Sequence, residues 1–171
     1  SDYDPFEKDL KKIADYNPRS MVTTVNTGKF NCRFFARAMY PNAFTLHNGI
    51  ELDALKFKDR LVIGKDVYYL DCDRWAERKV IEDTKDKFVI EMHGTFCTFR
   101  HEYEAKGVKA VYRYTFKRNS SEIEVEVVVS VPQDTTALAE LLEFDSPNKR
   151  PRISWEVGKL KNKQNIFIRK G

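Results

Sequence analysis

Apolar and polar residues alternate with a period of two along most of the chain, which is typical of β-strands with one buried face. Five stretches share this pattern: Phe30–Met39, Phe44–Phe57, Arg60–Asp71, Phe88–Glu104 and Tyr112–Val129. Shorter runs at Lys79–Glu82, Arg152–Val157 and Gln164–Lys170 predict further strands. Asn48-Gly49 is typical of a two-residue turn between strands, and Gly64-Lys65-Asp66 indicates a turn or a bulge. About nine or ten short strands are expected, which predicts an all-β fold, a mostly antiparallel sandwich or barrel.

Two segments change to the spacing of an amphipathic helix. Phe6–Tyr16 follows Asp4 and Pro5, which suit a helix cap and a first helical position. Towards the other end, Asp134 caps a segment that runs to Glu143 and carries an apolar stripe: Ala137, Leu138, Leu141 and Leu142. We therefore expect a short N-terminal helix and one short helix before the last strands. Both would pack on a single β-rich domain that spans residues 1–171.

The segment YRYTFKRNSSEIEVEVVV predicts a β-hairpin in one specific register. A four-residue loop at Arg118–Ser121 places three glutamates opposite polar partners: Lys117 and Glu122, Thr115 and Glu124, Arg113 and Glu126. On the other face it pairs aromatic with aliphatic residues: Phe116 and Ile123, Tyr114 and Val125, Tyr112 and Val127. Burial of a large apolar side chain contributes about 1.5–3 kcal/mol, against roughly 0.2–1 kcal/mol for a cross-strand charge pair. Burial therefore decides the face, and the glutamates are expected on the solvent side.

The same glutamate row supports an alternative, an acidic site made of Glu122, Glu124, Glu126 and Arg113. Carboxylate oxygens are ligands for hard divalent cations, and a guanidinium binds phosphate. If this face lined a cavity, the protein would be a carbohydrate- or phosphate-acting enzyme that uses Glu124 and Glu126 with Arg113. We expect instead that the protein is not an enzyme.

A second alternative places a ligand inside the sheet. If the hairpin closed into a lipocalin-like barrel, Tyr112, Tyr114 and Phe116 would line its interior, and the protein would bind a small molecule. The N-terminal Gly-x-Trp typical of lipocalins is missing from the sequence. The direction of the Glu124 and Tyr114 side chains separates these alternatives.

Charge changes the picture at the C-terminal end. The 171 residues carry a net charge of +4. Residues 147–171 hold eight basic residues and one acid, so this segment carries +7 and leaves −3 on the rest. Its candidate binding residues are the basic clusters: Lys149, Arg150, Arg152, Lys159, Lys161 and Lys163. These side chains could contact phosphates, whereas a lysine-rich edge that discourages strand pairing is the rival interpretation.

The function expected from this charge is a non-enzymatic binding or interaction domain. Its basic C-terminal segment would meet an acidic partner, either an acidic protein surface or a nucleic acid. Trp75 lies in a polar stretch and is a further candidate, as a platform for a sugar ring or a base. The alternative for Trp75 is a half-buried side chain that closes one end of the core. The oligomeric state is left open.

Metal and cofactor sites are not expected from the sequence. His93, Cys97 and His101 are four residues apart, and such positions on one strand lie about 13 Å apart. One ion with bonds of about 2 Å cannot reach all three. Glycine-rich nucleotide loops and the Gly-x-Ser-x-Gly elbow of hydrolases are missing as well.

Cysteine usage bears on localisation. Cys32, Cys72 and Cys97 are odd in number and widely spaced, which favours an intracellular protein, cytoplasmic or nuclear. The glycosylation acceptor pattern Asn119-Ser120-Ser121 leaves secretion as the alternative. No apolar run approaches the roughly 20 residues of a membrane span.

Overall fold

Period-two patterning produces strands along nearly the whole described chain. The computed structural model describes residues 10–46, 51–52, 56–57, 59–70, 76–99, 102–133, 135–140, 144–145 and 159–170. These residues form fifteen strands, with no α-helix among them. The first eight are β1 (Ala14–Asn17), β2 (Val22–Asn26), β3 (Phe30–Phe34), β4 (Asn42–Leu46), β5 (Glu51–Leu52), β6 (Lys56–Phe57), β7 (Arg60–Ile63) and β8 (Asp66–Tyr69). The others are β9 (Glu77–Asp83), β10 (Lys87–Gly94), β11 (Lys109–Lys117), β12 (Glu122–Val131), β13 (Ala137–Glu140), β14 (Phe144–Asp145) and β15 (Lys159–Lys170).

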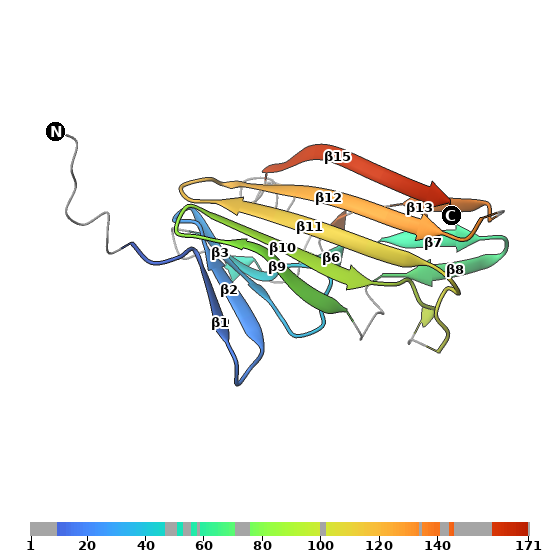
Figure 1. Cartoon of the computed structure of the whole chain (residues 1–171), viewed down its shortest axis with the longest axis horizontal. Helices are drawn as coiled ribbons and strands as arrows, with labels where there is room; N and C mark the ends of the chain where they lie inside the picture. The colour runs from blue at the N-terminus through green and yellow to red at the C-terminus, as the bar shows by residue number, and fades with distance from the viewer. Residues whose placement is uncertain are drawn as a thin grey trace.

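The strands are arranged in four sheets. Two sheets have five strands each, in the orders β1-β2-β3-β4-β5 and β15-β12-β11-β10-β9. A three-stranded sheet has the order β13-β7-β8, and β14 pairs with β6. All pairings are antiparallel except that of β12 with β15, which is parallel. In Figure 1, β9 to β12 and β15 run side by side, and β7, β8 and β13 lie towards the opposite end from β1.

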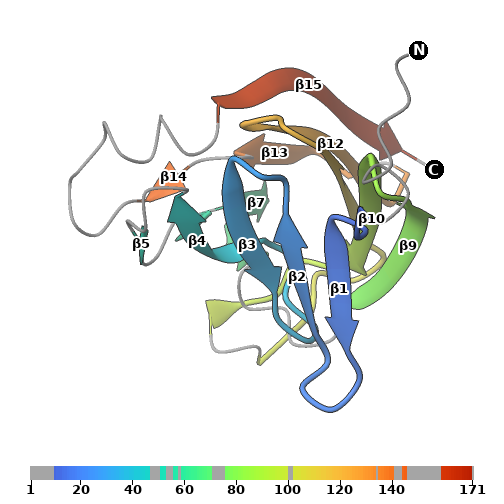
Figure 2. The ribbon, with the colours of Figure 1, turned by 90° about the vertical axis from the view of Figure 1, so that its left-hand side faces the viewer.

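The main core lies between the two five-stranded sheets, which face each other (Figure 2). Phe34 of β3 packs against β11, with its ring centroid 5.3 Å from that of Tyr114 and 5.9 Å from that of Phe116. Phe30, on the same strand, lies 6.3 Å from Phe116. Tilted and edge-to-face ring pairs of this kind stabilise a core beyond the area that they bury.

The predicted hairpin register is confirmed. Arg113 pairs with Glu126, Thr115 with Glu124, and Phe116 with Ile123. The aromatic and aliphatic face is buried, as expected: Tyr112, Tyr114, Phe116, Ile123, Val125 and Val127. The prediction held because hydrophobic patterning and charge patterning required the same parity.

Both predicted turn regions lie between strands that pair in antiparallel fashion. Gly64-Lys65 joins β7 to β8, and Gly64 has the positive φ of 62° that such a turn requires. β4 pairs with β5 in antiparallel fashion, so the chain reverses between them as expected. The register, Phe44 with Leu52 and Thr45 with Glu51, leaves an odd number of residues between partners, whereas a two-residue turn at Asn48-Gly49 requires an even number. The two turn residues themselves lie outside the described residues.

Both helix predictions are wrong in the described residues. Ala14–Asn17, the end of the expected N-terminal helix, is β1 and pairs with β2; residues 1–9 lie outside the described part. Ala137–Glu140, expected to be helical, is β13 and pairs with β7. Its Leu138 is 63% exposed while its neighbours are half-buried, so the local period is two rather than that of a helix.

The barrel alternative is also wrong, because no sheet closes on itself in the part of the chain that the structure describes. The lining expected for a lipocalin-like interior, Tyr112, Tyr114 and Phe116, packs against the facing sheet instead. Among the described residues, no helix has the length and apolar character needed to cross a membrane.

Candidate functional site

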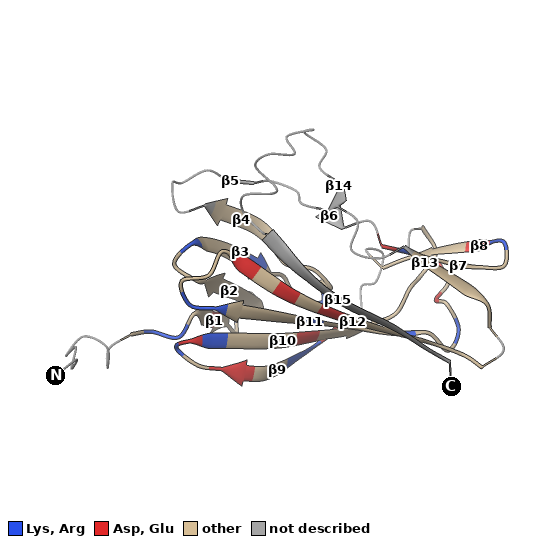
Figure 3. Ribbon diagram, turned by 90° about the horizontal axis from the view of Figure 1, so that it is seen from above, with Lys and Arg blue, Asp and Glu red and all other residues tan. Residues whose placement is uncertain are grey.

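The glutamate row lies along β12, where acidic positions appear as red bands in Figure 3. The alternating burial along the strand places these side chains on the face turned away from the core. Lys117 Nζ lies 3.1 Å from Glu124 Oε1, an ion pair on a diagonal of the hairpin rather than directly across it. Glu126 is exposed, and Glu122 is half-buried. The side chains therefore lie on the sheet surface with basic and polar neighbours, as expected for a solvated strand face.

A tighter cluster lies beside them, where Glu91 of β10 meets Arg113 of β11. Glu91 Oε2 accepts a hydrogen bond from Arg113 Nε at 2.7 Å and forms an ion pair with Arg113 Nη2 at 2.6 Å. His93 Nε2 donates to Glu91 Oε1 at 3.0 Å. The carboxylate is nearly buried, with 11% of its side chain exposed, while 42% of the Arg113 side chain is exposed.

The environment of Glu91 favours its charged form. Burial raises the pKa of this carboxyl, but the hydrogen bonds from Arg113 and then His93, together with their charges, outweigh burial and leave the pKa below its usual value. Arg113 is thereby committed to Glu91 rather than to Glu126, which faces it in the register. This arrangement supports a stabilising charge cluster more than the alternative acidic site.

The buried polar groups of the core serve packing. Tyr112 OH donates a hydrogen bond to Asp59 Oδ2, and Tyr114 OH donates to the Met39 carbonyl at 2.7 Å. Asp59 and both tyrosines have no exposed surface. Burial, with the nearby Asp59 charge as a further cause, raises the pKa of both phenols well above the ordinary value. These groups have no contact with solvent, so we assign them to the core.

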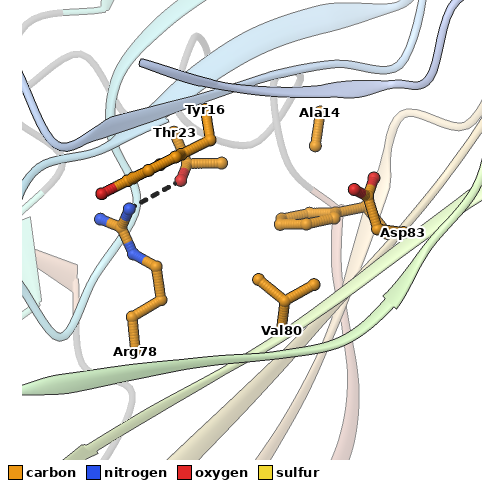
Figure 4. Close-up of a pocket in the computed structure, with 7 residues that line it drawn as sticks. Ala14, Tyr16, Thr23, Arg78, Val80 and Asp83 are labelled. Atoms are coloured by element: carbon orange, nitrogen blue, oxygen red, sulfur yellow. Dashed lines mark hydrogen bonds between the residues drawn. The ribbon is translucent and has the colours of Figure 1, made fainter. Parts of the chain in front are cut away.

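A cavity of about 180 Å³ opens at one edge of the two facing sheets, between the edge strands β1 and β9 (Figure 4). We call it the edge cavity. Most of its walls are apolar, and polar side chains stand at its ends; the lining residues are Ala14, Tyr16, Thr23, Arg78, Val80, Asp83 and Phe88. β1 supplies one wall and β9 the other, so the cavity spans the gap between the two sheets.

Arg78 reaches from β9 across this gap to the opposite sheet. Its Nη1 donates to Thr23 Oγ1 at 2.8 Å, and its Nη2 donates to the carbonyls of Phe34 and Phe35 at 3.2 and 3.3 Å. The guanidinium carbon lies 5.5 Å from the centroid of the Tyr16 ring, within the range of a cation–π contact. Burial lowers the pKa of Arg78 and Tyr16 acts in the opposite direction. The guanidinium is thus held in one orientation at the end of the edge cavity.

The basic candidates on the C-terminal strand are placed by the backbone of β15. Its parallel register with β12 sets Lys159 beside Glu122 and Lys161 beside Glu124. Lys163 falls where the register shifts, between Lys161 and Asn165. The remaining predicted residues, Lys149, Arg150, Arg152 and Trp75, lie outside the described residues.

The histidines and cysteines in the described part of the chain do not form a cluster. Cys32 and Cys97 are both buried, and the Cys97 thiol donates to the Tyr69 carbonyl at 3.4 Å. His93 binds Glu91, and His101 lies outside the described part. Within the described ranges, no group of three His, Cys, Asp or Glu side chains could hold a metal ion.

Comparison with known proteins adds one partial likeness. No protein-family model matches the chain. The chain is similar to the sarcoplasmic calcium-binding protein, beta chain, of Penaeus sp., with 30% identity over 89 residues. The match covers 48% of this chain and 46% of that protein, so the chain spans about half the length of the curated relative that it matches. This likeness assigns no family, and the described residues offer no cluster of metal ligands that would support calcium binding here.

Proposed function

We propose that the protein is a non-enzymatic binding domain whose basic C-terminal segment, residues 147–171, meets an acidic partner, and that this partner is a nucleic acid. The supporting observation is the position of β15, which forms one edge of a five-stranded sheet and carries five of the segment's eight basic residues: Lys159, Lys161, Lys163, Arg169 and Lys170. An edge strand is open along one side, so a long polyanion can follow it. Lysine and arginine neutralise phosphates regardless of sequence.

The state of the carboxylates supports a binding role over an enzymatic one. Glutamates that act as acid and base need access to a substrate and separated pKa values. Glu124 is paired with Lys117 on the outer face of the sheet, and Arg113 is engaged by the nearly buried Glu91. The edge cavity is lined by other residues, from β1, β2, β9 and β10.

We also infer that the two facing five-stranded sheets form a β-sandwich. The ring contacts of Phe30 and Phe34 with β11 support this finer description of the all-β fold. Sheets packed in this way leave their edge strands at the sides of the domain, where β15 lies.

The proposal is tested by fluorescence anisotropy with a labelled single-stranded oligonucleotide, titrated over a series of salt concentrations. If about four basic residues contact phosphates, the logarithm of the affinity should fall against the logarithm of salt with a slope of about −3. Neutralising three contacts should reduce the slope by about 2. Three triple variants to glutamine distinguish binding at the basic clusters from an effect of net charge. One changes Lys149, Arg150 and Arg152, and the second changes Lys159, Lys161 and Lys163. The matched control changes the exposed Lys29, Lys65 and Lys106.

The control triple should retain the slope of the unaltered protein, because its lysines lie outside the basic segment. A flat salt response, or no binding at low salt, contradicts the proposal. Equal losses in the control and in both segment variants would mean that net charge alone attracts the oligonucleotide, which also contradicts a site at β15.

A further inference from the structure

We propose that the edge cavity between β1 and β9 is a binding site for a small organic anion with a flat apolar body, of the class of aromatic carboxylates. This site is separate from the basic segment and does not rest on the function proposed above. It combines a fixed cation, apolar walls and an open mouth, and each of these features is argued in turn.

The cation is Arg78, and the groups that hold it are neutral. Its three acceptors are a hydroxyl and two backbone carbonyls, and no carboxylate pairs with it among the described residues. A partly buried guanidinium without an acidic partner favours an anion, because burial disfavours its charge while a carboxylate or phosphate compensates it. The hydrogen bonds to β2, to the end of β3 and to the residue after it fix the guanidinium before a ligand arrives, which lowers the entropy lost on binding.

Asp83, at the other end of the cavity, does not neutralise this cation. Its Oδ2 lies 3.4 Å from Nζ of Lys12, which precedes β1, so Asp83 forms an ion pair with this lysine rather than with Arg78. In Figure 4, Asp83 and Arg78 stand at opposite ends, with Val80 between them along β9. An anion bound at Arg78 therefore points its apolar part towards Val80.

The walls supply the apolar contacts. Phe88 is buried, whereas Tyr16 and Val80 are 51% and 49% exposed although both are large and apolar. Exposed apolar groups gathered at one opening mark binding sites more often than scattered ones do. An apolar cavity of about 150 Å³ accepts a benzene-sized ring, so about 180 Å³ accommodates the ring of a simple aromatic carboxylate.

A β-bulge in β9 brings these side chains to one face. Val89 pairs with Glu82 and Ile90 with Val80, so Ile81 is the extra residue. The bulge turns Asp83, rather than Glu82, towards the interior together with Val80 and Arg78. Without it, the cavity would lack this combination of side chains.

The test follows benzoate binding to the whole protein by two-dimensional ¹H–¹⁵N NMR. Benzoate should shift the backbone signals of Ala14 and Tyr16 and the side-chain Nε–H signal of Arg78 in a saturable manner. For a ligand of this size we expect a dissociation constant on the order of 1 mM. Benzamide has the same shape without the charge, and it should bind at least ten-fold more weakly; acetate, which lacks the ring, should also be weaker.

Variants assign the site. Ala14→Leu fills the cavity without removing the cation and should abolish the shifts, and Arg78→Gln should weaken benzoate to the level of benzamide. Lys79→Gln is the matched control, because Lys79 is an exposed cation on the same strand with its side chain on the outer face. The affinity of this variant for benzoate should equal that of the unaltered protein. If Arg78→Gln fails to fold, Ala14→Leu still tests whether the ligand binds in the edge cavity, and the comparison of benzoate with benzamide still tests whether binding depends on the negative charge. Equal binding of benzoate and benzamide, unchanged binding to Ala14→Leu, or the lack of any saturable shift overturns the proposal.

Discussion

Replacing Arg113 by glutamine should destabilise the protein by about 2 kcal/mol near pH 7. A hydrogen bond to a charged group contributes about 1.5–3 kcal/mol. Arg113 donates one from Nε to the nearly buried Glu91 carboxylate and forms an ion pair with it through Nη2. Breaking a fully buried ion pair costs about 3–5 kcal/mol. Because 42% of the Arg113 side chain is exposed, water can reach the pair, and we expect a value below that range.

A double-mutant cycle isolates the contribution of this contact. Glu91→Gln keeps the shape of the side chain and removes its charge. In that background, Arg113→Gln should cost only about 0.5 kcal/mol, which gives a coupling of about 1.5 kcal/mol. Urea denaturation followed by circular dichroism measures all four free energies of unfolding. If the losses of the two single variants add up to that of the double variant within about 0.3 kcal/mol, the stabilising role of the pair is refuted.

The pH dependence provides an independent check. The pKa of Glu91 is lowered in the folded protein, so the unfolded chain, with a pKa of about 4.3, binds the proton more readily. The stabilisation is therefore complete above about pH 5 and is lost as the pH falls through the lower, folded pKa. The difference in unfolding free energy between the unaltered protein and Arg113→Gln should shrink in that acidic range. A difference that is constant from pH 7 to pH 3 contradicts this assignment.

Three further predictions follow from the core, the turns and the thiols. Tyr112→Phe should cost about 2–3 kcal/mol in urea denaturation, because its hydroxyl binds a buried carboxylate, and Tyr114→Phe, which loses a bond to a neutral carbonyl, should cost about 1 kcal/mol; equal costs would contradict this. Gly107→Ala should lower the thermal midpoint of unfolding more than Gly64→Ala. Both glycines have a positive φ, but only at Gly107 would the new Cβ clash with a side chain, the ring of Pro132 at 2.8 Å. A larger loss for Gly64→Ala would contradict this clash. Burial raises the pKa of the Cys32 thiol, so an alkylating reagent at pH 8 should label it only after unfolding, which mass spectrometry of the digested protein detects; labelling of the folded protein counts against its burial.

The β11–β12 hairpin could be predicted because two independent patterns agreed. Its aromatic and aliphatic residues required one parity, and its charged residues required the same one. The predicted helices rested on weaker information, since a stripe of a few apolar positions in a short segment is only a weak local preference for a helix. At Ala137–Glu140, the chain forms a strand because it pairs with β7. Backbone hydrogen bonds to a neighbouring strand override a weak local preference for a helix.

The edge cavity could not be predicted from the sequence. Lys79–Glu82 was expected as a short strand, but β9 is longer and includes Arg78. The bulge at Ile81 then sets which side chains face inward, and it becomes visible only in the pairing with β10. The partnership of Glu91 with Arg113 was hidden for a similar reason. The two residues are far apart in sequence, and Arg113 already had an apparent partner in Glu126 across the hairpin.

The basic strand β15 has two explanations, and the register with β12 helps to separate them. In the first explanation, the lysines protect the edge, because lysine on an edge strand discourages pairing with another chain. Loss of that charge should then promote association of copies of the protein and leave nucleic-acid binding unchanged. Lys159 and Lys161 lie beside glutamates of β12, whereas Arg169 and Lys170 lie beside uncharged residues. A glutamate neighbour competes with a phosphate for the same cation, so the two residues without such neighbours should contribute more to the salt dependence of binding. If instead their neutralisation changes only the oligomeric state, the edge-protection explanation accounts for the charge of β15.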